Sequence, residues 1–423
     1  MYLFYLVYDI LLFVAMVVYL PVYALRGRVG AHLLMRMGFF PADQFEGLEG
    51  HEVVWLHAVS VGEARAAESL LRLMRARWPQ KRRVISIVTP TGYEILRHIA
   101  EKDEVIRYAP VDLSFVVRRF LAEIRPSLLV IFETELWPNL IRLSRARGAK
   151  VAVVNGRISE RSLRRYGRMR WLWRRLLKDV ALFCMQTEEA AQRIRTLGAW
   201  YRDVAVTGNI KFDVSADARE PSFAGALQQA VRDRILWICG STHDNEEETA
   251  LRLYKALRKD FSHLRLLIAP RHLERLDKIR RTIRLEGLNS LLLSRARGVE
   301  GSAVLLLDTI GDLSAAYRFA DIVFVGGSLV KQGGHNPIEP AVYGKAILFG
   351  AHMENFKEIR DRFIADNAAV EVAGPQELEF AMRRLLSSRQ EREALGARAR
   401  QLIEKNRGAA ERTMGFLEER VKA

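Results

Sequence analysis

The chain of 423 residues contains only two cysteines, Cys184 and Cys239, and each lies within an apolar run. This pattern predicts buried core thiols and leaves neither a disulfide framework nor a CxxC metal pair. The sequence also lacks the HExxH and DxD patterns and any cluster of His and Cys. We therefore expect no metal ion and no cofactor. The scarcity of cysteine agrees with a reducing compartment for the folded domains.

The N-terminal segment, residues 1–25, is almost free of charge, since Asp9 is its single charged side chain. It lacks the early positive charge and the small-residue cleavage site of a secretory signal peptide. About 20 apolar residues span a bilayer, and Arg26 and Arg28 predict that the rest of the chain is cytoplasmic. We expect a single-pass membrane anchor. The alternative is a helix embedded along the membrane interface, which Pro21 and several aromatic side chains leave open.

The composition is that of a folded protein with an excess of positive charge. Hydrophobic residues make up 49% of the chain, and 66 Lys and Arg against 50 Asp and Glu give a formal net charge of +16. Such a charge indicates an anionic partner: nucleic acid, an acidic membrane or a phosphorylated substrate. No RNP, KH or zinc-finger pattern is present, so we do not expect nucleic acid to be that partner.

Short apolar runs rich in β-formers alternate with helical patterns such as 64–77 and 115–124. The first series of predicted strands comprises 53–57, 84–89, 128–132, 151–155 and 204–207. The second series comprises 235–239, 265–269, 304–308, 321–325 and 346–349. This alternation predicts βαβ units, parallel sheets and hence an α/β protein. We expect two Rossmann-like domains that face a cleft, at 30–215 and 223–400, with a C-terminal helix at 401–423.

The glycine-rich loop GGSLVKQGGHNPIEP, residues 326–340, follows a predicted strand of the second domain. Glycine lets the backbone approach a ligand closely, and Pro337 suits the first position of a helix. The free N–H groups at such a helix start bind anions. Glu339 falls on the first turn, where its carboxylate could accept hydrogen bonds from both hydroxyls of a ribose. The loop therefore predicts a nucleotide-sugar site.

Three motifs of the first domain place charged side chains just after predicted strands: HAVSVGE (57–63), IFETELWPN (131–139) and VTGNIKFD (206–213). Glu63 opens a helix, where stabilisation by the helix dipole alone would also select it; a catalytic base is the other interpretation. Glu133 is costly to bury without a cation or a substrate hydroxyl. Lys211 is either a solvated charge or the partner of an anionic leaving group. Trp137 is expected to serve packing rather than sugar stacking.

The second domain carries further motifs at its strand ends. CGSTHDNEE (239–247) predicts a capped helix and a second turn that contacts an anion. IAPRH (268–272) brings Pro270 and Arg271 to the next strand end, where the guanidinium could hold a phosphate or carboxylate. Ile310, Gly311 and Asp312 follow another strand and could line the pocket of the base.

The segment 157–178 carries eight Arg and one Lys against one Glu, interleaved with aromatic and aliphatic residues. We interpret it as a basic amphipathic helix suited to a membrane interface and to phosphorylated lipid. A solvated helix face with a buried stripe is the alternative. RNA binding is possible on charge alone.

Taken together, HAVSVGE, FETELWP, TGNIKFD, GSTH, APRH and GGHNPIEP resemble the 3-deoxy-D-manno-octulosonic acid (Kdo) transferases of lipid A biosynthesis. The motifs follow the family's order over residues 57–340. The resemblance implies a GT-B fold and an inverting glycosyl transfer that needs no metal ion. The donor would be CMP-Kdo and the acceptor lipid IVA, in lipopolysaccharide core biosynthesis at the cytoplasmic face of the bacterial inner membrane.

The resemblance also implies a role for each matching residue. The general base corresponds to Glu63, and two residues that assist the transition state correspond to Glu133 and Lys211. The contacts to CMP correspond to Pro270, Arg271, Ile310, Gly311, Asp312, Asn336, Pro337, Ile338 and Glu339. Asp312 stands where a longer acid is expected. The alternatives are another GT-B enzyme, either a nucleotide-sugar transferase or an epimerase, and a non-catalytic membrane-surface protein of this fold.

Overall fold

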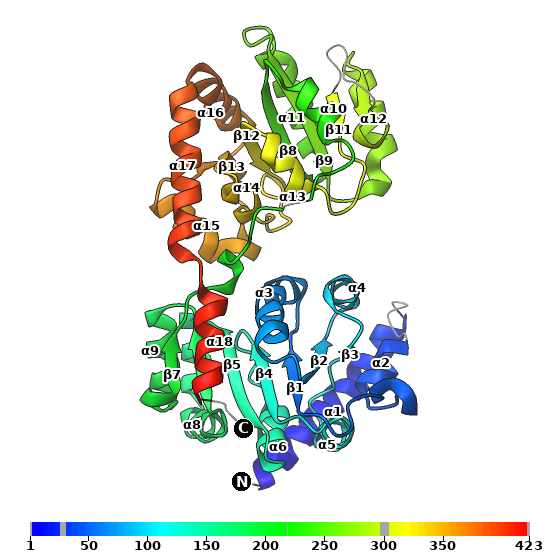
Figure 1. Cartoon of the computed structure of the whole chain (residues 1–423), viewed down its shortest axis with the longest axis vertical. Helices are drawn as coiled ribbons and strands as arrows, with labels where there is room; N and C mark the ends of the chain where they lie inside the picture. The colour runs from blue at the N-terminus through cyan, green and yellow to red at the C-terminus, as the bar shows by residue number, and fades with distance from the viewer. Residues whose placement is uncertain (1, 26–30, 218, 297–303, 421–423) are drawn as a thin grey trace. The chain divides into compact units, whose positions relative to one another are not determined.

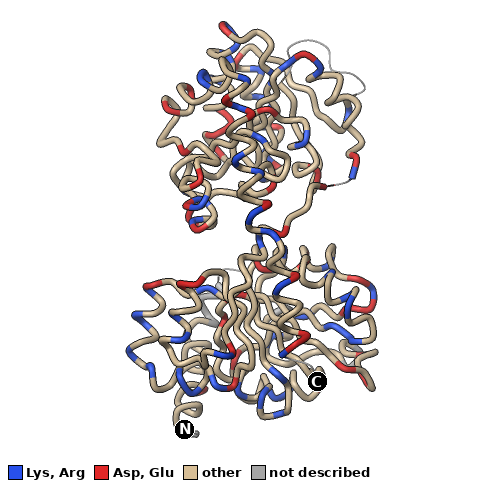
Figure 2. The backbone as a smooth tube through the Cα atoms, turned by 60° about the vertical axis from the view of Figure 1, so that its left-hand side comes forward, with Lys and Arg blue, Asp and Glu red and all other residues tan. Residues whose placement is uncertain are grey.

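A computed structural model describes residues 2–25, 31–217, 219–296 and 304–420 of the chain (Figure 1). The chain divides into two compact units. Unit 1 comprises residues 1–213 and 406–423, and unit 2 comprises residues 214–405. Lys and Arg are interspersed with Asp and Glu along the backbone of both units (Figure 2).

Unit 1 is built on a seven-stranded parallel sheet in the order β3-β2-β1-β4-β5-β6-β7. Its strands are β1 (Val53–His57), β2 (Arg82–Ile87), β3 (Glu104–Tyr108), β4 (Leu128–Phe132), β5 (Lys150–Gly156), β6 (Leu182–Met185) and β7 (Val204–Val206). Every residue of β1 and β4 is buried, because helices cover the central strands on both faces. Such strands are continuous apolar runs, which is why the sequence predicted them.

The helices of unit 1 connect these strands, apart from the two that precede the sheet and the one that ends the chain. They are α1 (Tyr2–Leu25), α2 (Ala31–Arg36), α3 (Val61–Arg77), α4 (Pro90–Ile99), α5 (Ser114–Ile124), α6 (Pro138–Ala146), α7 (Glu160–Gly167), α8 (Arg170–Leu176), α9 (Glu188–Leu197) and α18 (Ala409–Arg420). Short 3-10 turns include η1 (Ala42–Phe45), η2 (Leu177–Asp179), η3 (Tyr201–Asp203) and η4 (Ile210–Phe212). Amphipathic helices on both faces make unit 1 a doubly wound α/β domain.

Unit 2 repeats this design with a parallel sheet in the order β10-β11-β9-β8-β12-β13-β14. Its strands are β8 (Ile235–Thr242), β9 (Leu264–Pro270), β10 (Ser290–Leu292), β11 (Val304–Leu306), β12 (Ile322–Val325), β13 (Ala346–Gly350) and β14 (Val370–Val372). Its helices are α10 (Ala224–Ala230), α11 (Glu246–Leu257), α12 (Leu276–Leu285), α13 (Leu313–Ala316), α14 (Ile338–Val342), α15 (Lys357–Ala365), α16 (Pro375–Ser387) and α17 (Arg389–Asn406). The α/β class expected from the sequence is therefore confirmed.

Four strands are absent from the prediction, and three of them, β3, β10 and β14, lie at sheet edges. An edge strand is half exposed and carries polar side chains that interrupt the apolar run. In β3, Glu104 is buried but is paired with Arg75 and Arg83 at 2.6 and 2.7 Å. The fourth strand, β6, has only four residues, too few for a clear pattern.

The N-terminal helix α1 lies against unit 1 through one face. Tyr5 is buried, Leu12 and Met16 pack against the core, and the Tyr8 hydroxyl donates a hydrogen bond to Asp112. Asp9 accepts hydrogen bonds from the Ser114 backbone N–H at 3.0 Å and from the Asn139 side chain at 2.7 Å. The charge that looked anomalous in an apolar segment therefore satisfies the first N–H of α5.

The prediction of a membrane-spanning anchor at residues 1–25 is not confirmed. No helix in the described part of the chain is both long and apolar enough to cross a bilayer. The physical reason is that the side chains of Tyr8 and Asp9 form hydrogen bonds with residues of unit 1. The flanking residues Arg26 and Arg28 lie outside the described residues.

The opposite face of α1 is apolar and exposed. Its side chains are between 44% and 71% exposed and comprise Leu3, Leu6, Val7, Ile10, Leu11, Phe13, Val14, Val17, Val18 and Tyr19. A contiguous apolar surface of this kind marks an interaction site in a folded protein. Within α1, therefore, one face belongs to the protein core and the other faces outward.

The basic segment 157–178 is not one helix, as the sequence suggested, but two short ones. Helix α7 ends at Gly167 and α8 begins at Arg170. Leu172 and Leu176 are buried, whereas Trp171 is 65% exposed. The interruption turns the aromatic and aliphatic residues to different sides, so the segment combines a buried stripe with an exposed aromatic residue.

The last helix, α18, returns to unit 1 and packs against α3 and β6. Asp213 caps its first turn, since its carboxylate accepts hydrogen bonds from the backbone N–H groups of Gly408 and Ala410 at 2.6 and 2.5 Å. A carboxylate at a helix start satisfies N–H groups that lack partners within the helix. The cap ties the loop after β7 to the C-terminal helix.

The substitution Asp9→Leu tests whether α1 is an integral part of unit 1. It makes α1 more apolar but leaves the Ser114 N–H and the Asn139 amide without their acceptor. We expect the free energy of unfolding to fall by about 1–3 kcal/mol, the cost of unsatisfied buried polar groups. Urea denaturation in detergent, followed by tryptophan fluorescence, measures this change. Ile10→Leu on the exposed face is the control, and equal stability of the two variants would contradict the docked helix.

Candidate active site

In both units the strand order reverses beside the first strand of the sheet, between β1 and β4 in unit 1 and between β8 and β12 in unit 2. Open parallel sheets bind ligands at the carboxyl ends of the strands at such a reversal. Glu63 follows β1 and Glu133 follows β4. In unit 2, the segment 240–246 comprises the end of β8 and the loop after it, and the glycine-rich loop follows β12. Two motifs of the first domain, and in the second domain the segment 240–246 and the glycine-rich loop, therefore lie where open parallel sheets bind ligands.

Glu63 is buried at the start of α3, with 4% of its surface exposed. Its carboxylate accepts hydrogen bonds from the Val59 backbone N–H at 2.7 Å and from the Ser60 hydroxyl at 2.8 Å. The Ser60 oxygen in turn accepts from the Glu63 N–H at 3.3 Å. This is a reciprocal cap of the S-x-x-E type. Glu63 therefore has a structural role as part of a helix cap, and the same hydrogen bonds orient its carboxylate.

The pKa of Glu63 is raised from its ordinary value to about 7. Burial is the main cause, and the negative charge of Glu133 adds to it, while the hydrogen bonds from Val59 and Ser60 act in the opposite direction. A carboxyl group with a pKa near neutrality can accept a proton from a hydroxyl that becomes acidic during a reaction. The side chain thus has the protonation properties of a general base at neutral pH.

Glu133 lies between two cations. The Lys211 ammonium donates a hydrogen bond to one carboxylate oxygen at 2.8 Å, and the Arg157 Nε donates to the other at 3.0 Å. The backbone of Glu133 has a φ of 52°, a strained left-handed conformation for a residue with a side chain. Strain of this kind is found where the surrounding structure holds a residue for function. The structure thus brings Glu63, Glu133 and Lys211 together at one edge of the sheet.

The loop that carries Lys211 is held by amide side chains. The Asn155 side chain accepts a hydrogen bond from the Ile210 N–H at 2.9 Å, and the Asn209 side chain accepts from the Lys211 N–H at 3.0 Å. Phe212, next in the chain, is fully buried. A lysine whose backbone is fixed on both sides loses less conformational freedom when its ammonium binds a partner. This explains why Lys211 reaches Glu133 although it lies 78 residues further along the chain.

Trp137 serves packing, as expected. It packs against the core of unit 1, and its ring meets that of His57 edge to face, with centroids 4.5 Å apart. Its indole N–H donates a hydrogen bond to Glu135 at 3.1 Å. Glu135 is thereby held on the same edge of the sheet, where its charge contributes to the raised pKa of Glu63.

In unit 2, the buried carboxylate of Glu246 organises the glycine-rich loop. It accepts hydrogen bonds from the backbone N–H groups of Gly327, Ser328 and Leu329 at 2.7, 3.1 and 3.0 Å, and from that of His243 at 2.9 Å. Four donors on one carboxylate compensate for its removal from water. Glu246 therefore joins the loop after β8 to the loop after β12.

Glycine is required in these loops because backbone packs on backbone. A Cβ at Gly326 would lie 2.5 Å from the Ser241 carbonyl oxygen. Gly333 and Gly334 have φ values of 83° and 71°, which side chains rarely adopt. The structural reason for the glycine-rich sequence is thus close approach within unit 2 itself.

The predicted nucleotide contacts follow neighbouring strands of the run β11-β9-β8-β12. Asn336 forms a turn, accepting a hydrogen bond from the Ile338 N–H at 3.1 Å and donating to Glu339 at 3.3 Å. Pro337 caps α14, which has only five residues and therefore a smaller dipole than expected. The other predicted CMP contacts differ in exposure. The exposed ones are Arg271, Ile310 and Gly311, Asp312 is half-buried, and Pro270 and Ile338 are buried.

The exposure of Ile310 is unusual for an aliphatic side chain, at 88% of its surface. It stands beside Gly311, whose carbonyl accepts a hydrogen bond from Arg219 at 3.2 Å and whose φ is 91°. An apolar side chain held out by a tight turn offers a surface for a flat ring.

Two histidines stack next to the predicted donor residues. His243 and His335 lie with their rings parallel, centroids 5.2 Å apart and their Nε2 atoms 2.9 Å apart. Burial lowers the pKa of His335 to about 4, and the charges of His243 and Arg271 act in the same direction. Both rings are therefore neutral near pH 7, and one donates its N–H to the other.

Sequence reasoning missed two residues of the site. Arg157 belongs to the Glu133 cluster and was assigned to a membrane helix instead. Glu246 was included in a capping motif without a role of its own. For Glu246, the run of three acids after CGSTHDN was a usable signal, because only one of them is needed for the helix dipole. For Arg157, no local signal existed, since its partner lies 24 residues away.

The comparisons with known proteins agree with this geometry. Residues 31–214 match the family model described as 3-deoxy-D-manno-octulosonic-acid transferase (kdotransferase). The chain is 34% identical to the 3-deoxy-D-manno-octulosonic acid transferase of Haemophilus influenzae over 393 residues, covering 92% of this chain and 91% of the relative. It is 32% identical to the enzyme of the same name from Bordetella pertussis over 377 residues, covering 86% and 87%.

A solved structure resembles the fold without close sequence similarity. The UDP-GlcNAc 2-epimerase from Neisseria meningitidis, bound to UDP-GlcNAc, matches with a TM-score of 0.60 at 13% identity, covering 87% of this chain and all of the other. Two doubly wound domains with sites at their strand ends therefore define a GT-B-like protein. Within that class, the chain belongs to the 3-deoxy-D-manno-octulosonic acid transferases, which are glycosyltransferases.

The raised pKa of Glu63 predicts a dependence of stability on pH. Because the folded state binds this proton more tightly than the unfolded chain does, the stabilisation is fully present below about pH 4.5 and is lost as the pH rises through 7. Relative to Glu63→Gln, the wild-type protein should lose roughly 3 kcal/mol between pH 4.5 and pH 8. Urea denaturation at several pH values measures the difference.

Glu68→Gln, on the same helix, is the matched control and should follow the wild-type curve. Parallel curves for the wild-type protein and Glu63→Gln would mean that Glu63 titrates as an ordinary carboxyl group. That outcome would contradict the assignment of Glu63 as a base tuned to neutral pH.

The substitution Glu246→Gln should loosen the glycine-rich loop, because an amide oxygen cannot hold four backbone donors. We expect the N–H groups of residues 327–329 to exchange with solvent at least about tenfold faster, as expected for the loss of a charged hydrogen-bond acceptor. Hydrogen–deuterium exchange with mass spectrometry measures this rate. Glu248→Gln, two positions away and exposed, is the control. Equal exchange in both variants would refute the organising role.

Proposed function

We propose that this transferase moves Kdo from CMP-Kdo to a lipid IVA-type acceptor, in an inverting reaction that needs no metal ion. The observation that carries the proposal is Glu63, a buried carboxyl group with a pKa of about 7 beside Glu133 and its two cations. The names of the relatives supply the sugar, since they are 3-deoxy-D-manno-octulosonic acid transferases.

In the proposed reaction, Glu63 removes the proton from the 6′-hydroxyl of the acceptor disaccharide. The oxygen attacks the anomeric carbon of Kdo, and the bond from that carbon to the phosphate oxygen of CMP breaks. Lys211, still 21% exposed while paired with Glu133, offers positive charge to the carboxylate or phosphate that carries negative charge in the transition state. Glu133 holds that ammonium in place.

Unit 2 is proposed to hold the donor. Glu339 and Asn336 would bind the ribose hydroxyls, Arg271 the phosphate, and the exposed Ile310 the cytosine ring. Pro270, Gly311, Asp312, Pro337 and Ile338 would complete this pocket. A monophosphate leaving group develops less charge than a diphosphate, so backbone donors and cations can stabilise it without Mg²⁺. The hydrogen bond from Asn336 to Glu339 places these two side chains next to each other, which supports a shared contact with the ribose.

We further propose that the enzyme works at the cytoplasmic face of the inner membrane, with α1 lying along the membrane surface. The exposed apolar face of α1 supports this orientation, and its polar contacts to unit 1 argue against a spanning one. A helix in the interface plane buries one apolar face among the lipids. The net charge of +16 favours an anionic membrane and a phosphorylated acceptor.

The experiment that tests the proposal is incubation with CMP-Kdo and lipid IVA, followed by mass spectrometry of the lipid. We expect the lipid to gain Kdo, at a rate that rises with pH through about 7 as Glu63 loses its proton. Glu63→Gln should abolish the product, by at least about a thousandfold, while CMP still protects unit 2 from unfolding. An active Glu63→Gln variant would exclude Glu63 as the base.

The fold likeness to a UDP-sugar epimerase favours one rival function. Protection against thermal unfolding by UDP, but not by CMP, would favour that alternative. Absence of any nucleotide effect would instead favour a non-catalytic protein of the same fold.

A further inference from the structure

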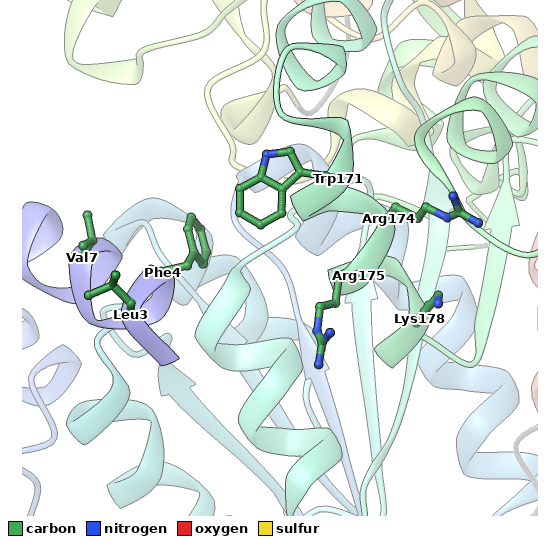
Figure 3. A pocket seen from close by; sticks show the side chains of 7 residues that line it. All are labelled: Leu3, Phe4, Val7, Trp171, Arg174, Arg175 and Lys178. Carbon is green, nitrogen blue, oxygen red and sulfur yellow. The ribbon is translucent and has the colours of Figure 1, made fainter. Parts of the chain in front are cut away.

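A groove of about 670 Å³ lies in unit 1 between the first turns of α1 and the helix α8 (Figure 3). Its two walls differ in chemistry. The wall from α1 is apolar and consists of Leu3, Phe4 and Val7. Trp171 of α8 extends this apolar wall, and the opposite wall, from α8 and η2, carries the cations Arg174, Arg175 and Lys178. The groove therefore presents a hydrocarbon surface and a positive charge to the same occupant.

The apolar wall is exposed far beyond what packing within unit 1 requires. Leu3 is 71% exposed and Trp171 is 65% exposed. The rings of Phe4 and Trp171 meet edge to face with centroids 6.4 Å apart, so they form one continuous aromatic edge of the groove. Tryptophan in such a half-exposed position is typical of the boundary between lipid and water. This wall fits an acyl chain.

The cationic wall is only partly neutralised within the protein. Among the described residues, no carboxylate lies within ion-pair distance of Arg174, Arg175 or Lys178 at 4.0 Å or less, and the charge of the neighbouring Asp179 acts on Arg175 but is shared with Arg142 and Arg145. By contrast, Arg164 on the neighbouring helix α7 pairs with Glu160 at 3.1 Å. Three cations against the single acid Asp179 leave this short segment with a net positive charge, which attracts an anion. This wall fits a phosphate group.

We propose that the groove binds one anionic phospholipid from the membrane monolayer in which α1 lies. The chains would follow Leu3, Phe4 and Val7, and the phosphate would sit among the cations of α8 and η2. The site rests on the proposed membrane contact and adds to it a discrete lipid that ties α1 to α8. No residue of the groove belongs to the Glu63, Glu133 and Lys211 cluster, which favours a membrane lipid over the acceptor.

A free phosphate ion does not explain the apolar wall, and a neutral lipid does not explain the cations. The face of α1 also continues past the groove through Leu6, Ile10 and Phe13. A lipid in the groove would therefore lie at the edge of a larger lipid-facing surface. These features select an amphiphile with a negative head group.

The test is native mass spectrometry of the full chain in detergent with phosphatidylglycerol, which is anionic, and with phosphatidylcholine, which is zwitterionic. The wild-type protein should retain one phosphatidylglycerol with clear preference over phosphatidylcholine. The triple variant Arg174→Gln, Arg175→Gln, Lys178→Gln should bind phosphatidylglycerol about 100-fold more weakly, roughly fivefold for each cation.

The matched control removes three exposed arginines of α7, with Arg161→Gln, Arg164→Gln and Arg165→Gln. It has the same net charge as the groove variant and should stay within about fivefold of the wild-type affinity. A second pair of variants examines the apolar wall without changing charge. Trp171→Ala should weaken binding about tenfold, whereas Trp200→Ala, an exposed tryptophan of unit 1 outside the groove, should not.

Equal weakening in both triple variants would overturn the proposal, because it would show a diffuse charge effect. Displacement of the lipid by lipid IVA would also overturn it and assign the groove to the acceptor, and displacement by inorganic phosphate would reduce it to an anion site. Kdo transfer by the wild-type protein is measured alongside. If the protein transfers Kdo but retains no lipid, lipid binding in the groove is refuted and the proposed function stands. If it retains the lipid but does not transfer Kdo, only the proposed function is refuted.

Discussion

The compensation of Glu133 by Lys211 and Arg157 is the interaction on which the proposed chemistry of unit 1 depends. Two carboxylates near each other in a poorly hydrated place raise each other's pKa, and a base that remains protonated at neutral pH cannot act. Lys211 and Arg157 compensate the charge of Glu133, while the hydrogen bonds from Val59 and Ser60 oppose the effect of burial and leave the pKa of Glu63 at about 7. The pairing with Glu133 also holds the Lys211 ammonium group where the proposed reaction would develop negative charge.

Each partner in this cluster is held by a different part of the fold. The reciprocal cap with Ser60 orients Glu63, a strained backbone presents Glu133, and the Asn155 and Asn209 side chains fix the loop of Lys211. The parallel sheet brings these three loops to one edge. Unit 2 uses a related device, in which buried Glu246 binds two loops through backbone N–H groups. In both units a buried carboxylate is stabilised by local donors.

In the N-terminal helix α1, one acidic residue determines that an apolar segment packs against unit 1. From the sequence alone, the segment is expected to be a membrane anchor. Asp9 instead receives hydrogen bonds from Ser114 and Asn139, so one face of α1 becomes part of unit 1. The outward face remains apolar, and at the groove its first turns lie opposite the cations of α8 and η2. The proposed attachment along a membrane surface rests on this division between a docked face and an exposed face.

The sequence by itself determined the class of the fold, the central strands and the positions of the charged motifs. It could do so because buried parallel strands are continuous apolar runs and because the loops after them carry the ligands. Short and edge strands, the break between α7 and α8, and the docking of α1 depended on contacts distant in the chain. Only the tertiary structure decided that Arg157 and Lys211 share Glu133, and that Glu246 holds the glycine-rich loop. The physical reason is that the energy of a charge depends on which charges and donors surround it after folding, and local sequence does not contain that information.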